Sequence, residues 1–189
     1  MRVLLPMVAA VAIAFAGVAG AADLKSGLQP GEEIGAFTVE KCGGAADDGV
    51  KVGQKLCYRC KLGARPMVMV FSRHADDKLA KLVAELDKTV TDKADAKLAA
   101  FVNLIGEDAG DLKTKAEKFE KNHKAGKIAI VVPQDQPNGP EDYKISKDAD
   151  VTVIIAKEGK VEANYALKAD GLNAEAIKKI VADANKLVE

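Results

Sequence analysis

Apolar residues occur along this chain in short continuous runs that alternate with stretches of helical period. Four runs have the length of a buried strand, and they cover residues 67–71, 98–105, 128–132 and 151–156. Runs of this kind, bounded by proline, glycine or polar residues, are typical of strands that are buried on both faces of a sheet. We therefore predict four core strands.

Three other segments repeat their apolar residues with the period of an amphipathic helix. The first follows residues 67–71, and its apolar face consists of Leu79, Leu82, Val83, Leu86 and Val90. The second ends near Gly126, and its face consists of Leu112, Ala116 and Phe119. The third is capped by Asn173, and its face consists of Ile177, Ile180, Val181, Ala184, Leu187 and Val188.

Two hairpins complete the predicted elements. Residues 36–41 alternate like a short strand, and residues 50–57 are the expected partner strand. Near the other end, the turn at Glu158-Gly159 predicts that residues 161–167 pair antiparallel with residues 151–156. Strands that alternate with helices favour a largely parallel central sheet, to which the second hairpin adds an antiparallel edge.

The first 21 residues have the pattern of a secretory signal peptide. Arg2 is followed by the apolar stretch 3–19 and by the small residues of Ala19-Gly20-Ala21. A membrane anchor is the alternative, since roughly 18 apolar residues can begin to span a bilayer. The small residues at the end of the apolar stretch favour cleavage by a signal peptidase, after which no stable membrane insertion is expected. We predict an exported protein, periplasmic or extracellular, with a leader loop at 22–35 and one domain at 36–189.

Composition excludes some classes of partner. The chain carries 28 Lys and Arg against 28 Asp and Glu, and it has no Trp. A chain with balanced charge has no net positive charge to attract a polyanion such as a nucleic acid, and few aromatic residues are present to stack on bases. We do not expect a nucleic-acid partner.

Several short strings, in this order, resemble those of the thioredoxin-like superfamily, over roughly residues 31–188. They are IGAFTV at 34–39, RPMVMVF at 65–71, VPQD at 132–135 with YKI at 143–145, and VTVII at 151–155 with EGKV at 158–161. The nearest branch is the redoxins, which include the alkyl hydroperoxide reductase/thiol-specific antioxidant proteins and exported thiol-disulfide reductases. The resemblance implies a three-layer α/β/α domain with a mixed central sheet and an N-terminal β-hairpin extension.

The chain departs from that family at the family's redox site. Family members carry their redox cysteines directly after the first core strand, where the following helix begins and lowers the thiol pKa. Residues 72–79 contain no cysteine here, and Val151 stands where the family has a cis-proline. A non-proline cis bond costs about 3 kcal/mol, so we expect a trans peptide. His74 lies in this segment, and a surface histidine is the favoured interpretation.

A Cys-x-x-Cys pair occurs elsewhere, at Cys57 and Cys60, before the first core strand. Arg59, Lys61 and Arg65 surround it, and cations favour the thiolate over the thiol. A straight strand would separate the pair from the family's site by roughly 20 Å.

Three interpretations of the cysteines stay open. In the first, a disulfide between Cys57 and Cys60, or between Cys42 and one of them, staples a non-catalytic binding or scaffold module. In the second, Cys57 attacks a disulfide of a partner protein and Cys60 resolves the product, without an organic cofactor. In the third, Cys57 and Cys60 bind a metal, and Cys42, His74 or His123 complete its ligands.

Overall fold

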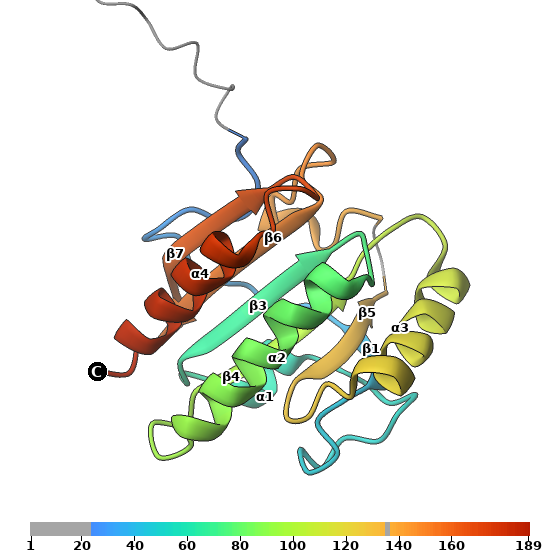
Figure 1. Ribbon diagram of the computed structural model, residues 1–189, viewed down its shortest axis with the longest axis horizontal. Coiled ribbons are helices and arrows are strands. Elements are labelled where there is room, and N and C mark those ends of the chain that lie inside the picture. Colours follow the sequence, from blue (N-terminus) through green and yellow to red (C-terminus); the bar gives the residue numbers. More distant parts are fainter. Residues whose placement is uncertain (1–23, 135–136) are drawn as a thin grey trace, which may run out of the picture.

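A computed structural model describes residues 24–134 and 137–189, so the predicted signal peptide at 1–21 lies outside the described residues. Seven strands form one sheet in the order β2-β1-β5-β4-β3-β6-β7 (Figure 1). The strands are β1 Val39–Gly43, β2 Lys55–Leu56, β3 Met67–Ser72, β4 Ala99–Leu104, β5 Ala129–Pro133, β6 Val151–Lys157 and β7 Lys160–Leu167. The helices are α1 Tyr58–Leu62, α2 Asp77–Asp92, α3 Ala109–His123, η1 Glu141–Tyr143 and α4 Ala174–Lys186.

The sheet is mixed, as predicted. Strand β3 pairs in parallel with β4, and β4 with β5. On its other side β3 pairs antiparallel with β6, which forms a hairpin with β7. Because β6 runs opposite to β3, the turn between β6 and β7 lies at the end of the sheet where β3 begins. This end is the one that matters for the candidate site.

Helices α2, α3 and α4 cover one face of the sheet, as Figure 1 shows. Alternate residues of the central strands point toward them, among them Val68, Val70 and Val102. The apolar faces predicted for the three helices all pack here, and residues such as Leu82, Leu86 and Ile180 are fully or almost fully buried. Burial of a large apolar side chain stabilises the fold by about 1.5–3 kcal/mol.

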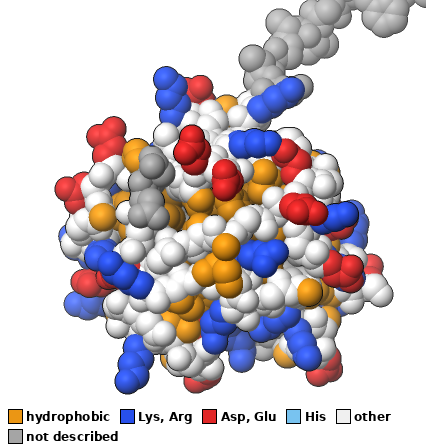
Figure 2. All heavy atoms as spheres, turned by 180° about the vertical axis from the view of Figure 1, so that it is seen from behind, with side chains coloured by type: hydrophobic (Ala, Val, Ile, Leu, Met, Phe, Trp, Pro, Cys, Tyr) orange, Lys and Arg blue, Asp and Glu red, His pale blue; other side chains and the backbone are white. Residues whose placement is uncertain are grey.

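The opposite face has a thinner cover, built from α1, η1 and the segment before β1. Its core is aromatic: Tyr58 stacks on Phe101, and Tyr143 contacts Phe37 and Phe71. Figure 2 shows this face, on which hydrophobic side chains surface in the middle between Lys, Arg, Asp and Glu. Two outer layers around a mixed sheet confirm the predicted three-layer α/β/α architecture.

Two local expectations need correction. The strand expected at residues 50–57 is reduced to the two residues of β2, because residues 50–54 turn around Lys41 instead of running beside it. Lys41 exchanges backbone hydrogen bonds with Gln54 and Gly53. Residues 58–62, for which no helix is expected from the sequence, form the short helix α1.

None of the helices in the described part of the chain has the length and hydropathy of a membrane span.

Candidate redox site

The cysteine pair lies at the start of α1. Cys57 is the N-cap of this helix, and its Sγ atom accepts a hydrogen bond from the backbone amide of Cys60 at 3.0 Å. The two residues form a disulfide, with their Cα atoms 5.2 Å apart. The bridge therefore lies within one short helix and joins no separate elements of the fold.

The pair is open to solvent. Cys60 is exposed and Cys57 is half-buried. Thiol-disulfide exchange requires a thiolate of the partner to approach a disulfide sulfur, so access to at least one sulfur is a precondition. The geometry meets this condition.

The helix that carries the pair is fixed at the end of the sheet where β3 begins. Tyr58 is the first residue of α1, and Gly63 ends the helix with φ of 62°. Beyond it, the carbonyl of Ala64 accepts a hydrogen bond from the amide of Glu158 in the turn between β6 and β7. The family's redox position follows Ser72, at the opposite end of the same strand. The predicted separation between the pair and that position is thus the length of β3.

The three cations near the pair differ in their contacts. Lys61 is exposed. Arg65 donates from Nε to the carbonyl of Lys97 at 2.8 Å. Arg59 lies against the β6–β7 turn, since a Cβ added at Gly159 would be 3.2 Å from its Nη2 atom. Their effect on the two thiols stays a prediction.

A buried polar network beneath α1 escaped the sequence analysis. Lys41 is 1% exposed, and its ammonium donates to Asp48 at 2.8 Å and to the carbonyls of Ala45 and Val50 at 2.8 and 2.9 Å. Asp48 also accepts a hydrogen bond from the hydroxyl of Tyr58, the residue that follows Cys57. The network therefore ties the first residue of the redox helix to the loop between β1 and β2.

Both acidic groups of this network have shifted pKa values. Burial tends to raise the pKa of Asp48, but hydrogen bonds from Lys41 and Tyr58 outweigh it and hold that pKa below its usual value. Burial, reinforced by the Asp48 carboxylate, raises the pKa of Tyr58 far above its usual value. Asp48 is thus a charged anchor for Tyr58, and no proton transfer through the pair is expected near neutral pH.

The structure does not bring the proposed metal ligands together. Cys42 is buried in the core between the sheet and helices α2 to α4, where burial raises its pKa to about 11. Cys57 and Cys60 adjoin the opposite face through α1, and His74 lies beyond the far end of β3. Among residues 24–134 and 137–189, no three Cys, His, Asp or Glu side chains form a group that could hold a metal. The same separation rules out a bridge from Cys42 to the pair in this fold.

A structural arginine fills the position of the family's redox site. Arg73 donates from Nε to the carbonyl of Ala149 at 2.9 Å and from Nη2 to the side chain of Asn138 at 2.7 Å. His74 is exposed and contacts Asp150 at 3.2 Å. No cis peptide bond occurs in the described residues, so the bond before Val151 is trans, as expected.

A cleft borders α1, and no residue of the β6–β7 turn lines it. It has a volume of about 660 Å³ and is lined by Tyr58, Lys61, Leu62 and Arg65. The other walls come from residues 45–48, the end of α2, the start of β4 and residues 126–127. A cleft of this size falls within the range of ligand-binding pockets.

Comparison with known proteins identifies the fold. No family model matches the sequence, and no curated protein matches it. A candidate protein disulfide isomerase from Bacteroides thetaiotaomicron matches with a TM-score of 0.62 at 15% identity, over 87% of this chain and 94% of that one. The AhpC protein of Mycobacterium tuberculosis matches with a TM-score of 0.56 at 13% identity, over 84% and 98% of the two chains.

A third similar structure is the thioredoxin domain of a thiol-disulfide oxidoreductase from Bacteroides vulgatus. It matches with a TM-score of 0.53 at 20% identity, over 82% of this chain and 99% of that domain. At such identities the likeness concerns the fold and does not extend to residues of a site. With its mixed sheet and its matches to these proteins, the chain has a thioredoxin-like fold.

Proposed function

We propose that this chain is an exported thiol-disulfide redox protein whose reactive pair is Cys57 and Cys60. The observation that carries the proposal is the position of the pair: a disulfide within one surface helix, with Cys60 exposed. Support for export comes from the pattern of the first 21 residues, and disulfide chemistry suits an oxidising compartment outside the cytosol.

The greater exposure of Cys60 than of Cys57 favours Cys60 as the residue that meets the partner, the reverse of the sequence-based expectation. A thiolate of the partner attacks Sγ of Cys60, a mixed disulfide forms, and the bond to Cys57 breaks. Cys57 leaves as a thiolate, and the amide of Cys60, which already donates to this sulfur, stabilises its charge. A second thiolate of the partner then attacks the partner's own sulfur in the mixed disulfide.

That second attack releases Cys60 as a thiolate, which takes a proton from water. The pair has then gained two electrons, and the partner has formed a disulfide. The reverse sequence, in which the Cys60 thiolate attacks a partner disulfide and Cys57 resolves the product, reduces the partner. Either direction needs a protein partner with a thiol or disulfide and no bound organic cofactor.

A purely structural role for the bridge is less favourable on energetic grounds. The two cysteines are three positions apart, so the bridge closes a very short loop. In the chain-entropy treatment such a bridge contributes about 2 kcal/mol, whereas one that closes 100 residues contributes about 4.7 kcal/mol. The bridge also connects no two elements that would otherwise separate.

A second candidate function is a non-catalytic binding or scaffold module. The observation that favours it is Arg73, whose hydrogen bonds to the 137–149 loop fill the place of the family's redox cysteines. Under this alternative the disulfide is present but does not exchange with any partner.

Trapping of mixed disulfides separates the two candidates. The chain carries Cys42→Ser in every sample, and each single variant, Cys57→Ser or Cys60→Ser, is mixed with a protein that holds an accessible disulfide. We expect an adduct that survives with Cys57→Ser, since the resolving sulfur is gone, and a weaker one with Cys60→Ser. If neither variant forms an adduct while both stay folded, the redox proposal is wrong and the module is favoured.

A further inference from the structure

The cleft beside α1 adjoins the residue that follows Cys60, so a partner's chain whose cysteine reacts with Cys60 can extend into it. Lys61 directly follows Cys60, and its side chain lines the cleft. Tyr58 and Leu62, on the same helix, form the wall next to it. Because an extended chain advances about 3.3 Å per residue, the residues that flank the partner's cysteine would reach this cleft within a few positions.

The wall that carries the cysteines is cationic. Helix α1 contains Arg59 and Lys61 and no acidic residue, and Arg65 follows it. Among the described residues, the Lys61 side chain has no hydrogen bond or ion pair, and Arg65 is engaged only through Nε with a backbone carbonyl. These charges are therefore not neutralised within the chain. In Figure 2 Lys and Arg side chains gather along the lower part of the molecule, the end at which β3 begins in Figure 1.

The carboxylates of the cleft lie on its other walls, and two of the three already have partners. Asp48 is held by Lys41 and Tyr58. Asp87 accepts a hydrogen bond from the backbone amide of Lys127 at 2.6 Å, whereas the ammonium of Lys127 has no partner in the described part of the chain. Asp47, the third, is exposed, and a backbone amide does not neutralise the charge of Asp87. The excess of positive charge therefore lies on the α1 wall, at Lys61 and Arg65.

We propose that this cleft binds an acidic segment of the partner's polypeptide chain, directly beside the partner's reactive cysteine. The inference rests on the proposed redox function and adds a substrate preference to it. Carboxylates in the segment would pair with Lys61, Arg65 and Lys127, while its apolar groups would lie against Leu62 and the ring of Tyr58. Such contacts mainly raise the rate of productive encounter, and salt screens them.

A rate comparison tests the preference. The reduced full chain with Cys42→Ser reacts with two peptide disulfides, in which the cysteine is flanked by two Glu or by two Lys, and with uncharged hydroxyethyl disulfide. At low salt we expect the acidic peptide to react roughly fivefold faster than the basic one, and at 0.5 M NaCl the ratio should fall toward one. Equal rates at low salt would overturn the inference and leave the redox function intact.

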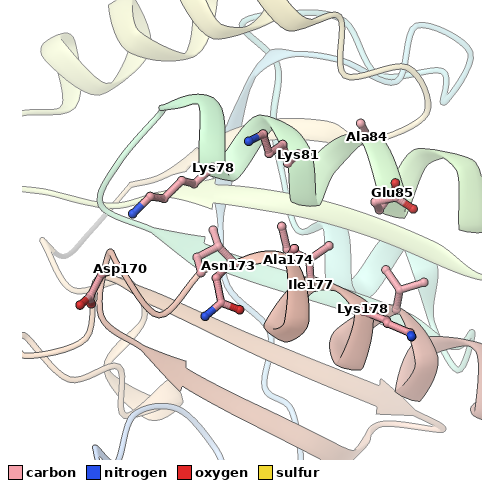
Figure 3. Close-up of a pocket in the computed structure, with 11 residues that line it drawn as sticks. Lys78, Lys81, Ala84, Glu85, Asp170, Asn173, Ala174, Ile177 and Lys178 are labelled. Atoms are coloured by element: carbon pink, nitrogen blue, oxygen red, sulfur yellow. The ribbon is translucent and has the colours of Figure 1, made fainter.

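A pair of charge-matched variants locates the preference. Lys127→Glu changes the cleft on a wall that does not carry the cysteines, so the ratio of the two peptide rates should fall roughly threefold. Lys81→Glu makes the same change of net charge in α2, beside a separate groove of about 710 Å³ between α2 and α4 (Figure 3). That groove shares no lining residue with the cleft, although both adjoin α2, and the ratio should change much less. Equal effects of the two variants would refute a role for the cleft.

A binding measurement separates failure of the inference from failure of the redox function. Fluorescent peptides with serine in place of cysteine are titrated into the oxidised chain. Tighter binding of the acidic peptide, weakened by Lys127→Glu and not by Lys81→Glu, supports the cleft even if no exchange occurs. If hydroxyethyl disulfide does not react and the two peptides bind equally, both proposals are wrong.

Discussion

Replacing Asp48 by asparagine removes one charge from the network that holds α1, and its cost follows from the geometry. Lys41 is 1% exposed, and in the variant its ammonium faces two backbone carbonyls and a neutral amide oxygen, with no compensating charge. Breaking one side of a buried ion pair costs about 3–5 kcal/mol, because the other charge stays buried without compensation. Asp48 retains 17% exposure, which admits some water, so we place the loss near the lower end, at about 3 kcal/mol.

The assay is urea unfolding at pH 7 of the parent, Asp48→Asn, Lys41→Met and the double variant. A double-mutant cycle should give a coupling of about 2 kcal/mol between the two residues. As a control, Lys113→Gln breaks the ion pair with Glu40, in which the lysine is 40% exposed, and should cost less than about 1 kcal/mol. If Asp48→Asn costs no more than this control, the reasoning about the buried network is refuted.

The remaining predictions concern pH, the disulfide and one turn. The pKa of Asp48 is lower in the folded state than in the unfolded state. Its contribution to the free energy of unfolding is therefore complete above the unfolded pKa of about 3.9 and is lost as the pH falls through the lower folded value. Acid unfolding should be steeper for the parent than for Asp48→Asn. Loss of the bridge in Cys60→Ser should lower the free energy of unfolding by only about 2 kcal/mol in urea, and a loss above about 4 kcal/mol would indicate a staple. Gly44→Ala places a Cβ 1.9 Å from the carbonyl oxygen of Ile128 at φ +66° and should lower the free energy of unfolding by more than about 3 kcal/mol. Gly49→Ala, at φ +75° in open space, should lower it by about 1 kcal/mol. Similar losses for the two variants in thermal or urea unfolding would contradict the clash.

The core elements could be predicted from the sequence because burial on both faces leaves a clear pattern. The run at residues 67–71 corresponds to β3 and the run at 128–132 to β5, each within one residue of the observed bounds. Helix α2 was predictable because its apolar residues fall on one face and Asp76 caps its first turn. In these segments local pattern and tertiary packing agree.

Helix α1 was not predictable, because five residues are too few to show a helical period. Its N-cap is a cysteine, which is not among the usual capping residues. Tertiary contacts hold it in place: Tyr58 is buried, stacks on Phe101 and bonds to Asp48. Short helices of this kind depend on packing that no local pattern reports.

The buried network was missed for a related reason. Lys41 lies in a short alternating strand, where a lysine is expected to face solvent. Its burial depends on a turn at residues 45–50 that closes over the ammonium with two carbonyls and one carboxylate. The sequence signal available is weak: an acidic residue in a glycine-rich turn, seven positions after a lysine.

The redox equilibrium of the pair with a glutathione buffer tests the proposed function most directly. The chain with Cys42→Ser is equilibrated at pH 7 with mixtures of reduced and oxidised glutathione. The fraction of the Cys57–Cys60 pair that is reduced is then measured by alkylating the thiols and determining the mass of the protein. An accessible, exchanging pair should titrate within the buffer range, with a reduction potential above about −300 mV. A pair that stays fully oxidised at every ratio, with a potential well below that value, would contradict a role in electron transfer.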